Sequence, residues 1–231
     1  MKKLPIGRQE FSKLIEGNCI YVDKTKYIYQ LLQQQYYFLS RPRRFGKSLL
    51  LNTIKEIFLG NKDLFKGLWI YDKTDWKTHP VIKISFSNID YKNLGLSQAI
   101  NDELDGIAKK NNIKLEAATV GPKFRELIEG LSETEGVVIL IDEYDKPIID
   151  YLDALDKAEE NRDILKNFYS VIKDADQYIR FFFITGVSKF SKVSIFSDLN
   201  NLDDITLDDN YSEMLGWTQE ELEKYFPEYI S

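Results

Sequence analysis

Short apolar runs alternate with segments of helical periodicity along most of the chain. Runs rich in β-branched and aromatic residues, which are typical of buried strands, occur at 36–39, 81–87, 137–142 and 181–186. Apolar side chains recur at the spacing of an amphipathic helix over residues 49–58, 97–111, 121–132 and 154–175. This alternation predicts an α/β domain in which a mainly parallel sheet lies between two layers of helices.

The two ends of the chain carry weaker patterns. Near the start, a short helical segment is followed by a small apolar strand around Cys19 to Val22, and Asp23 has the position of an N-cap for the next helix. Near the end, Ile205 to Leu207 is a candidate edge strand. Thr218 and Glu221 have the spacing of a capping box, which predicts a last short helix.

A basic loop joins the first strand to the helix that follows it. Residues 40–50 read SRPRRFGKSLL, so that Gly46, Lys47 and Ser48 match the end of the phosphate-binding motif G-x-x-x-x-G-K-[ST]. The unpaired N–H groups and the dipole at a helix start favour an anionic phosphate. Lys47 adds a positive charge and Ser48 a hydroxyl for Mg²⁺, so the loop predicts a nucleotide site.

Arg41 stands where the motif has its first glycine. The loop must therefore turn by means of Ser40 and Pro42. Arg41, Arg43 and Arg44 bring cations to the site that could pair with phosphates, and Arg43 and Arg44 could instead act across a subunit contact. Taken alone, the loop also fits an ordinary helix preceded by basic residues.

A second stretch supports the nucleotide site. Residues 136–147 read GVVILIDEYDKP, an apolar strand that ends in the adjacent carboxylates Asp142 and Glu143. Ligands of open α/β sheets bind at the carboxyl ends of the strands, so Asp142 can hold Mg²⁺ and Glu143 can orient water. The alternative is a strand that ends in solvated acids. The strand at 81–87 comes between the two motifs, as in the class of P-loop proteins with a catalytic glutamate beside the metal-binding aspartate.

Composition limits the function classes. The net charge of −6 and the pI near 5.1 argue against a broad nucleic-acid-binding face, with the loop arginines as a local exception. The only cysteine, Cys19, and the only histidine, His79, leave too few soft ligands for a zinc site. No run approaches the ~18 apolar residues of a membrane span, and no secretory signal follows the N-terminal lysines. These features predict a cytoplasmic protein without a membrane segment.

Distinctive motifs are spread over nearly the whole chain: LPIGRQEF at 4–11, YVDKT at 21–25, SRPRRFGKSLL at 40–50, LIDEYDKP at 140–147 and ITGVSKFSKVSIFSDLNNL at 184–202. Together they resemble the bacterial AAA-ATPase-like proteins, whose loop reads RPRRFGKS and usually has this arginine in place of the first glycine. Members often carry a C-terminal PD-(D/E)XK nuclease-like domain, and nothing similar is evident here. The resemblance implies one AAA-ATPase-like P-loop domain over residues 1–231, which ends where a helical lid or an effector region would begin.

The expected site has loop, metal and sensor parts. Nucleotide binding is expected from Arg43, Arg44, Phe45, Gly46, Lys47, Ser48 and Leu49, with Ser48 and Asp142 as the Mg²⁺ ligands and Lys47 and Glu143 as catalytic residues. By resemblance, Thr185 or Ser188 senses the γ-phosphate or the attacking water, although a strand-end threonine that caps a turn is an equal alternative. The resemblance also allows Asp23 to Thr25 to contact the nucleotide, but we favour a simple helix cap.

The sequence thus predicts a protein that binds ATP with Mg²⁺ and hydrolyses it, as the ATPase module of a larger protein. The absence of an N-K-x-D guanine motif favours adenine. The main rival is a slow or non-hydrolysing ATP-dependent switch or scaffold that controls a C-terminal effector such as a nuclease-like domain, with nucleic acid as a partner of that effector. A small-molecule kinase is a third interpretation, for which no acceptor site is evident. The sequence does not indicate the oligomeric state.

Overall fold

A parallel sheet forms the middle layer of the protein. The computed structural model describes residues 2–132, 135–189, 195–196, 199 and 201–229. In this part of the chain the strands are all parallel, in the order β2-β3-β4-β1-β5. Their bounds are β1 Tyr36–Ser40, β2 Val81–Ser85, β3 Val137–Asp142, β4 Ile179–Gly186 and β5 Asp203–Asp204.

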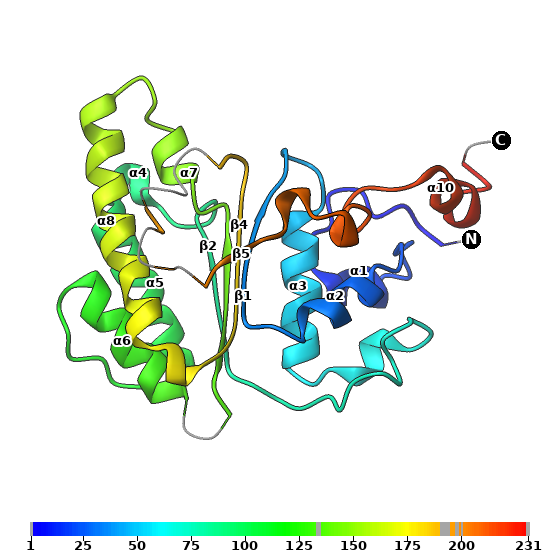
Figure 1. The fold of residues 1–231 in the computed structure, drawn as a ribbon, viewed down its shortest axis with the longest axis horizontal. Coiled ribbons are helices and arrows are strands. Elements are labelled where there is room, and N and C mark those ends of the chain that lie inside the picture. Colours follow the sequence, from blue (N-terminus) through cyan, green and yellow to red (C-terminus); the bar gives the residue numbers. More distant parts are fainter. Residues whose placement is uncertain (1, 133–134, 190–194, 197–198, 200, 230–231) are drawn as a thin grey trace.

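Helices cover both faces of this sheet (Figure 1). The helices α1 Phe11–Glu16, α2 Thr25–Leu31 and α3 Lys47–Phe58 lie on one side. The other side carries α4 Tyr91–Leu94, α5 Leu96–Lys110, α6 Val120–Leu131, α7 Lys146–Ile149 and α8 Leu155–Asp174. The last helix, α10 Gln219–Tyr225, lies away from the sheet near both chain ends. The predicted three-layer α/β fold is confirmed.

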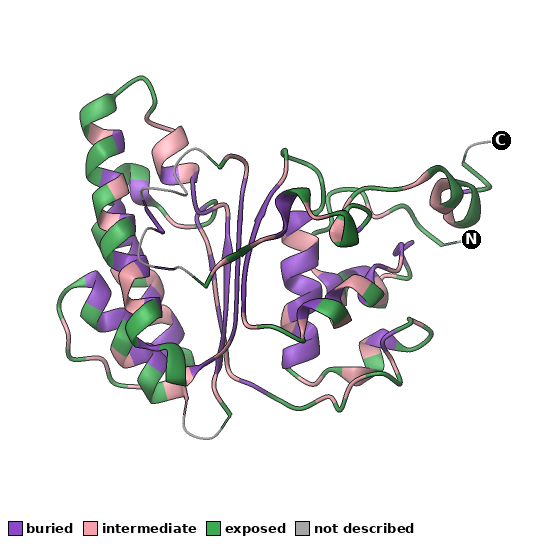
Figure 2. Cartoon of the chain, in the orientation of Figure 1, coloured by how far each residue is buried: buried purple, intermediate pink, exposed green. Residues whose placement is uncertain are grey.

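The pleat of the strands sends alternate side chains into two separate cores. Tyr36 and Phe38 of β1 pack with α5, α6 and α8, whereas Tyr37 and Leu39 pack with α3. Every residue of β1 and β3 is buried, and Figure 2 shows the central strands buried between the helical layers. A strand covered on both faces must be apolar throughout, which explains the continuous apolar run at 137–142.

The strand order brings three strand ends together. β4 lies between β1 and β3, and the register pairs Ser40 with Gly186 and Ile141 with Ile184. β2, the strand expected between the two motifs, pairs with β3 at the sheet edge and sets Ser85 beside Asp142. The carboxyl ends of β1, β3 and β4 therefore share one edge, where open α/β sheets bind their ligands.

Two predicted strands are wrong. Residues 19–22 do not join the sheet, and Cys19 makes only an isolated bridge to Lys3. This stretch is apolar because Tyr21 packs in the α3 core while Ile20 and Val22 contact Phe226. The segment 205–207 is a 3₁₀ turn that follows the short strand β5, because the Asp204 side chain accepts the Thr206 N–H at 3.1 Å and turns the chain.

The helix start predicted at Thr218 is confirmed, whereas α2 has Lys24 and not Asp23 as its N-cap. Thr218 and Glu221 form the expected capping box at the start of α10. At the start of α2, Asp23 Oδ1 accepts hydrogen bonds from the N–H and the hydroxyl of Thr25, at 2.9 and 2.6 Å. Asp23 Oδ2 also accepts the Trp69 N–H at 2.7 Å. Asp23 therefore stabilises a helix start and the loop beside it.

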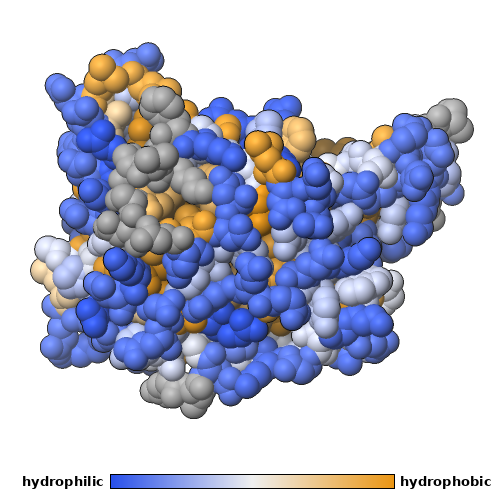
Figure 3. All heavy atoms as spheres, viewed as in Figure 1, coloured by the Kyte–Doolittle hydropathy of each residue, from blue (hydrophilic) through white to orange (hydrophobic). Residues whose placement is uncertain are grey.

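The surface in the view of Figure 3 is hydrophilic over most of its area, with hydrophobic residues gathered between the two helical layers. A second hydrophobic area lies at the upper left, where α8 begins and where Leu152 and Leu155 are exposed. Across the described residues, no helix combines the length and the apolar character that crossing a membrane requires.

Candidate functional site

The loop between β1 and α3 is shaped by its last glycine. Gly46 is the N-cap of α3 and has a φ of +93°, and Arg44 has a φ of +67°. A side chain at Gly46 would be strained in this left-handed conformation, so the match to the motif glycine has a backbone reason. The N–H groups of the first helical turn have no intrahelical partner, and no side chain caps them here. An anion at this point would meet free donors and the positive end of the helix dipole.

Lys47 lies against this loop and is buried. Its Nζ donates to the carbonyl oxygens of Arg41 at 2.8 Å and Pro42 at 3.0 Å. Burial lowers the pKa of the Lys47 ammonium, and the nearby carboxylates, Asp142 first among them, act in the opposite direction. The loop carbonyls and the carboxylates thus fix a positive charge at the edge where the strands end.

Arg41 does not face the site as the sequence led us to expect. Its guanidinium donates to the carbonyl of Thr206 and, at 3.3 Å, to that of Ser40, while its N–H bonds to the Gly186 carbonyl at 3.2 Å. Arg41 therefore ties the loop to the end of β4 and to the turn after β5. Arg43 and Arg44 are exposed, so they are the loop arginines free to approach a phosphate.

Asp142 joins the loop helix to two strands. Its Oδ2 accepts the Ser48 hydroxyl at 2.6 Å, and its Oδ1 accepts the Thr185 hydroxyl at 2.8 Å. Asp142 is 3% exposed and Thr185 is fully buried. The predicted metal ligands Ser48 and Asp142 are thus in direct contact, and Thr185 is the candidate sensor that bonds to Asp142.

These donors suit a hard cation. Mg²⁺ prefers oxygen ligands and is commonly held by one or two carboxylates together with substrate phosphates. Ser48 and Asp142 supply one hydroxyl and one carboxylate beside the phosphate-binding loop. In the described parts of the chain, no cluster of three or more His, Cys, Asp or Glu side chains could hold a metal by itself. The donor set therefore fits Mg²⁺ with phosphates as further ligands.

Glu143 follows Asp142 directly but points elsewhere. Its φ is +55°, an uncommon conformation for a residue other than glycine. Its carboxylate accepts a hydrogen bond from the hydroxyl of Ser87, just beyond β2. Ser87 was not among the residues singled out from the sequence, although it is the last residue of the strand predicted at 81–87. The structure ends β2 at Ser85, so Ser87 lies just beyond the strand end.

Ser188 makes a different contact from Thr185. Its N–H and its hydroxyl bond to Asp145 Oδ2 at 2.8 and 3.0 Å, and Val187 donates its N–H to the same carboxylate. Asp145 is fully buried, and burial raises its pKa although these hydrogen bonds act to lower it. The structure thus separates the two candidate sensors: Thr185 contacts Asp142, while Ser188 is held by a carboxylate that fixes the loop after β4.

Gly186 permits this arrangement. A Cβ at Gly186 would lie 2.3 Å from Tyr144 Cε1 and 3.0 Å from Asp145 Oδ1. Tyr144 also donates its hydroxyl to the Ser188 carbonyl at 3.0 Å. The segment after β3 and the segment after β4 are therefore packed too closely for any side chain at Gly186.

Comparison with known proteins identifies the family of the chain. The model of a family described as predicted AAA-ATPase matches residues 5–196. An uncharacterised protein in the vnfD 5′ region of Azotobacter chroococcum mcd 1 is 48% identical over 237 residues, a match that covers 97% of this chain and 45% of that relative. No solved structure matches the chain. The matched residues contain the loop, Asp142 and Thr185, and the chain belongs to the AAA-ATPase-like family.

Proposed function

We propose that this domain binds ATP with Mg²⁺ and hydrolyses it. The observation that carries the proposal is the contact of Ser48 and Thr185 with the two oxygens of Asp142, beside the N-terminus of α3. Residues from three separate elements converge there, so an ordinary helix cap does not account for them. Family membership supports nucleotide binding as the common property of the site.

Different residues of the site bind the phosphates and the metal. The N–H groups at the start of α3, Lys47 and the exposed Arg43 and Arg44 bind the phosphates, while Phe45, Gly46 and Leu49 shape the wall of the site. Ser48 and Asp142 would hold Mg²⁺, which would supply charge stabilisation for phosphoryl transfer. To bind phosphates, the Lys47 ammonium exchanges its bonds to the loop carbonyls for bonds to phosphate oxygens.

Glu143 is the proposed base. It follows the metal-binding aspartate, so that its carboxylate can orient water and accept a proton once it leaves the hydroxyl of Ser87. Thr185 lies against Asp142 and is the proposed sensor, since any change at the metal ligand reaches its hydroxyl directly. Ser188 supports the neighbouring loop through Asp145.

The hydrogen bond between Ser87 and Glu143 also favours a second candidate function. A base that is held by another residue suits a slow switch, in which binding rather than turnover carries the signal. Because the match covers 45% of the relative, the whole protein would contain regions that the ATPase module controls. By the family resemblance such an effector is nuclease-like and nucleic acid is its partner. The buried free thiol of Cys19 fits the reducing cytoplasm as the place of action.

Calorimetric titration with Mg·ATP tests the proposal. Lys47→Ala should abolish measurable binding, whereas Lys62→Ala, a lysine of the 3₁₀ turn after α3, should leave the affinity unchanged. Equal affinity in the Lys47 variant and the wild type would refute the nucleotide site. If the wild type binds Mg·ATP tightly but releases no phosphate, the protein is an ATP-dependent switch and not an ATP hydrolase.

A further inference from the structure

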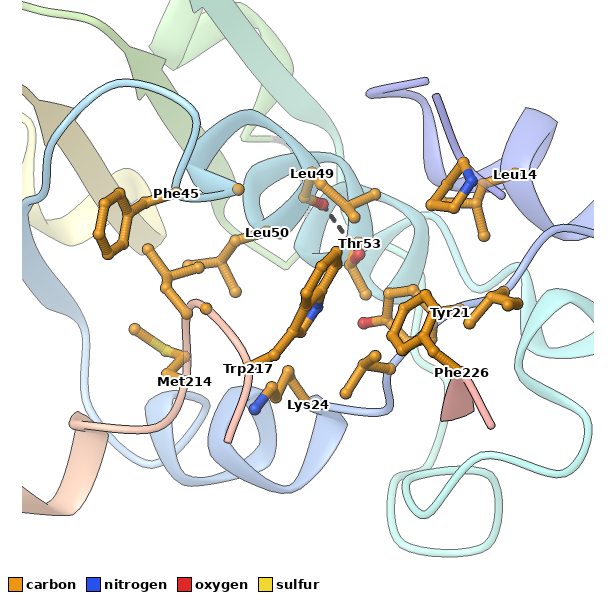
Figure 4. A pocket seen from close by; sticks show the side chains of 16 residues that line it. Leu14, Tyr21, Lys24, Phe45, Leu49, Leu50, Thr53, Met214, Trp217 and Phe226 are labelled. Carbon is orange, nitrogen blue, oxygen red and sulfur yellow. Dashed lines mark hydrogen bonds between the residues drawn. The ribbon is translucent and has the colours of Figure 1, made fainter. Parts of the chain in front are cut away.

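A pocket with mostly apolar walls opens beside the phosphate-binding loop. It has a volume of about 90 Å³ and is bounded by the segment before α2, the start of α3 and the residues that follow Asp209–Tyr211. Figure 4 shows the side chains of Tyr21, Leu49, Met214, Trp217 and Phe226 around this space. Segments from both ends of the chain thus build one cavity against α3.

The pocket is continuous with the loop. Phe45 and Gly46 belong to the loop and also line the pocket. Leu49, in the first turn of α3, lines it as well. A ligand whose phosphates bind at the N-terminus of α3 therefore has the pocket within reach of its other end. Phe45 is 45% exposed although it is a large apolar residue, which fits a side chain that contacts a ligand.

The lining suits a flat, uncharged ring system. Trp217 is 57% exposed and packs on Phe226 with 4.8 Å between the ring centroids. Among the described residues around the pocket, Lys24 alone is charged, and its Nζ is 2.5 Å from Glu221 Oε1. An apolar wall with an exposed indole favours stacking and disfavours a further phosphate.

We propose that this pocket binds the heterocyclic base of the nucleotide whose phosphates lie on residues 43–48. The proposal rests on the proposed function, because it assigns the remaining part of the same ligand. Trp217 supplies the stacking surface, and Leu49 and Met214 supply apolar contacts. The proposed nucleotide site thus has two parts: the loop, which binds the phosphates, and the pocket, which binds the base and is called the base half below.

Residues 213–226 form the cover of the base half. Lys24 donates to both carboxylate oxygens of Glu221, at 2.5 and 2.6 Å, and Tyr27 donates to Glu213 at 3.0 Å. Glu221 also accepts the Thr218 N–H at 2.9 Å as part of the capping box. One carboxylate thus joins the start of α10 to the segment before α2, and Glu221 acts as a positioning residue for Trp217.

The test compares two ligands that share a phosphate chain. Mg·ATP and magnesium tripolyphosphate are titrated calorimetrically into the wild type, Trp217→Ala, Trp217→Phe and Trp69→Ala. Loss of a stacking surface should weaken ATP binding about tenfold in Trp217→Ala and leave tripolyphosphate binding unchanged. Trp217→Phe keeps an aromatic ring and should restore most of the ATP affinity. Trp69 is 42% exposed and does not line the pocket, so Trp69→Ala is the matched control.

Three other results of these titrations would contradict the proposal. If Trp217→Ala binds ATP as tightly as the wild type, or loses affinity for both ligands equally, the pocket does not hold the base. If Trp217→Phe is as weak as Trp217→Ala, stacking is not the interaction, and the proposal fails. If the wild type binds neither ligand, the proposed function itself is wrong, which is a result distinct from failure of the pocket.

Discussion

The hydroxyl of Ser48 donates to Oδ2 of Asp142 across 2.6 Å, although 94 positions separate the two residues in the chain. The bond joins the first turn of α3 to the end of β3. It forms because β4 lies between β1 and β3, so that the ends of all three strands reach one edge of the sheet. Thr185 of β4 then completes the group by donating to the other oxygen of Asp142. The topology, rather than proximity in the sequence, assembles the candidate site.

Replacing Glu143 should separate chemistry from binding. Glu143→Gln keeps the shape of the side chain but loses the charge that orients and deprotonates water, a loss expected to cost on the order of 10²–10⁴ in rate. ATP affinity should stay within about threefold, because the Glu143 carboxylate is hydrogen-bonded to the hydroxyl of Ser87 and is not one of the proposed phosphate or Mg²⁺ ligands. Phosphate release and calorimetry on the same preparation measure the two quantities.

Asp142→Asn serves as the comparison for Glu143→Gln. It removes the charge that faces Ser48 and Thr185, so Mg²⁺-dependent binding should weaken as well as hydrolysis. Wild-type turnover in Glu143→Gln would exclude this residue as the base. Asp145 would be a poor substitute, because it is fully buried and engaged by Val187 and Ser188.

Removing the Ser87 hydroxyl should release the proposed base. A net hydrogen bond contributes about 0.5–1.5 kcal/mol, so Ser87→Ala should raise the rate of ATP hydrolysis by about two- to tenfold if the bond to Glu143 restrains turnover. Ser132→Ala, just after α6, is a matched control, since its hydroxyl bonds to the Glu129 carbonyl, away from the candidate site. An unchanged or lower rate in Ser87→Ala would mean that Ser87 does not restrain Glu143.

The two candidate sensors should respond differently to loss of their hydroxyls. Thr185→Val is nearly isosteric and leaves Oδ1 of Asp142 without this donor, which should reduce hydrolysis about tenfold and raise the Mg²⁺ concentration needed. Ser188→Ala removes one bond to Asp145 and should mainly lower the melting temperature. Steady-state kinetics over a Mg²⁺ series and thermal denaturation distinguish the variants. The opposite pattern would make Ser188 the sensor.

The sequence predicts those parts of the fold that local chemistry determines. The strands at 36–40, 137–142 and 179–186 are buried on both faces, so their apolar runs are unambiguous. Ser48 and Asp142 could be placed together because each stands at a junction that the motif and the strand end define. What these positions share is that their structural role follows from immediate neighbours in the chain.

Contacts between distant segments could not be predicted in this way. The Arg41 guanidinium donates to the carbonyl of Thr206, 165 positions away. Its positive charge had predicted a contact with phosphate, but the side chain points to this carbonyl instead. The apolar stretch at 19–22 resembles a strand because it packs against Phe226 and the α3 core, which no periodicity reveals. The buried Asp145 looks in sequence like another solvated acid of DEYDKP.

The contribution of Asp145 to the free energy of unfolding should decrease as the pH rises. Burial raises its pKa above the ordinary 3.8, so the folded protein keeps this proton to a higher pH than the unfolded chain does. Between the two pKa values the native state binds more protons, and the contribution of Asp145 to the free energy of unfolding falls as the pH rises. Asparagine does not titrate. The difference in unfolding free energy between wild type and Asp145→Asn should therefore decrease as the pH rises above 3.8.

Asp150 offers a control of the opposite sign. Burial acts to raise its pKa, but hydrogen bonds from Lys92, Tyr91 and Lys146 outweigh burial and lower the pKa to about 2. The contribution of Asp150 to the free energy of unfolding is present above pH 3.8 and is lost as the pH falls towards 2. The difference in unfolding free energy between wild type and Asp150→Asn should therefore increase as the pH rises through that range. Urea denaturation at a series of pH values measures both differences. A flat or rising difference for Asp145→Asn would show that the hydrogen bonds from Val187 and Ser188 compensate fully for the burial of this carboxylate.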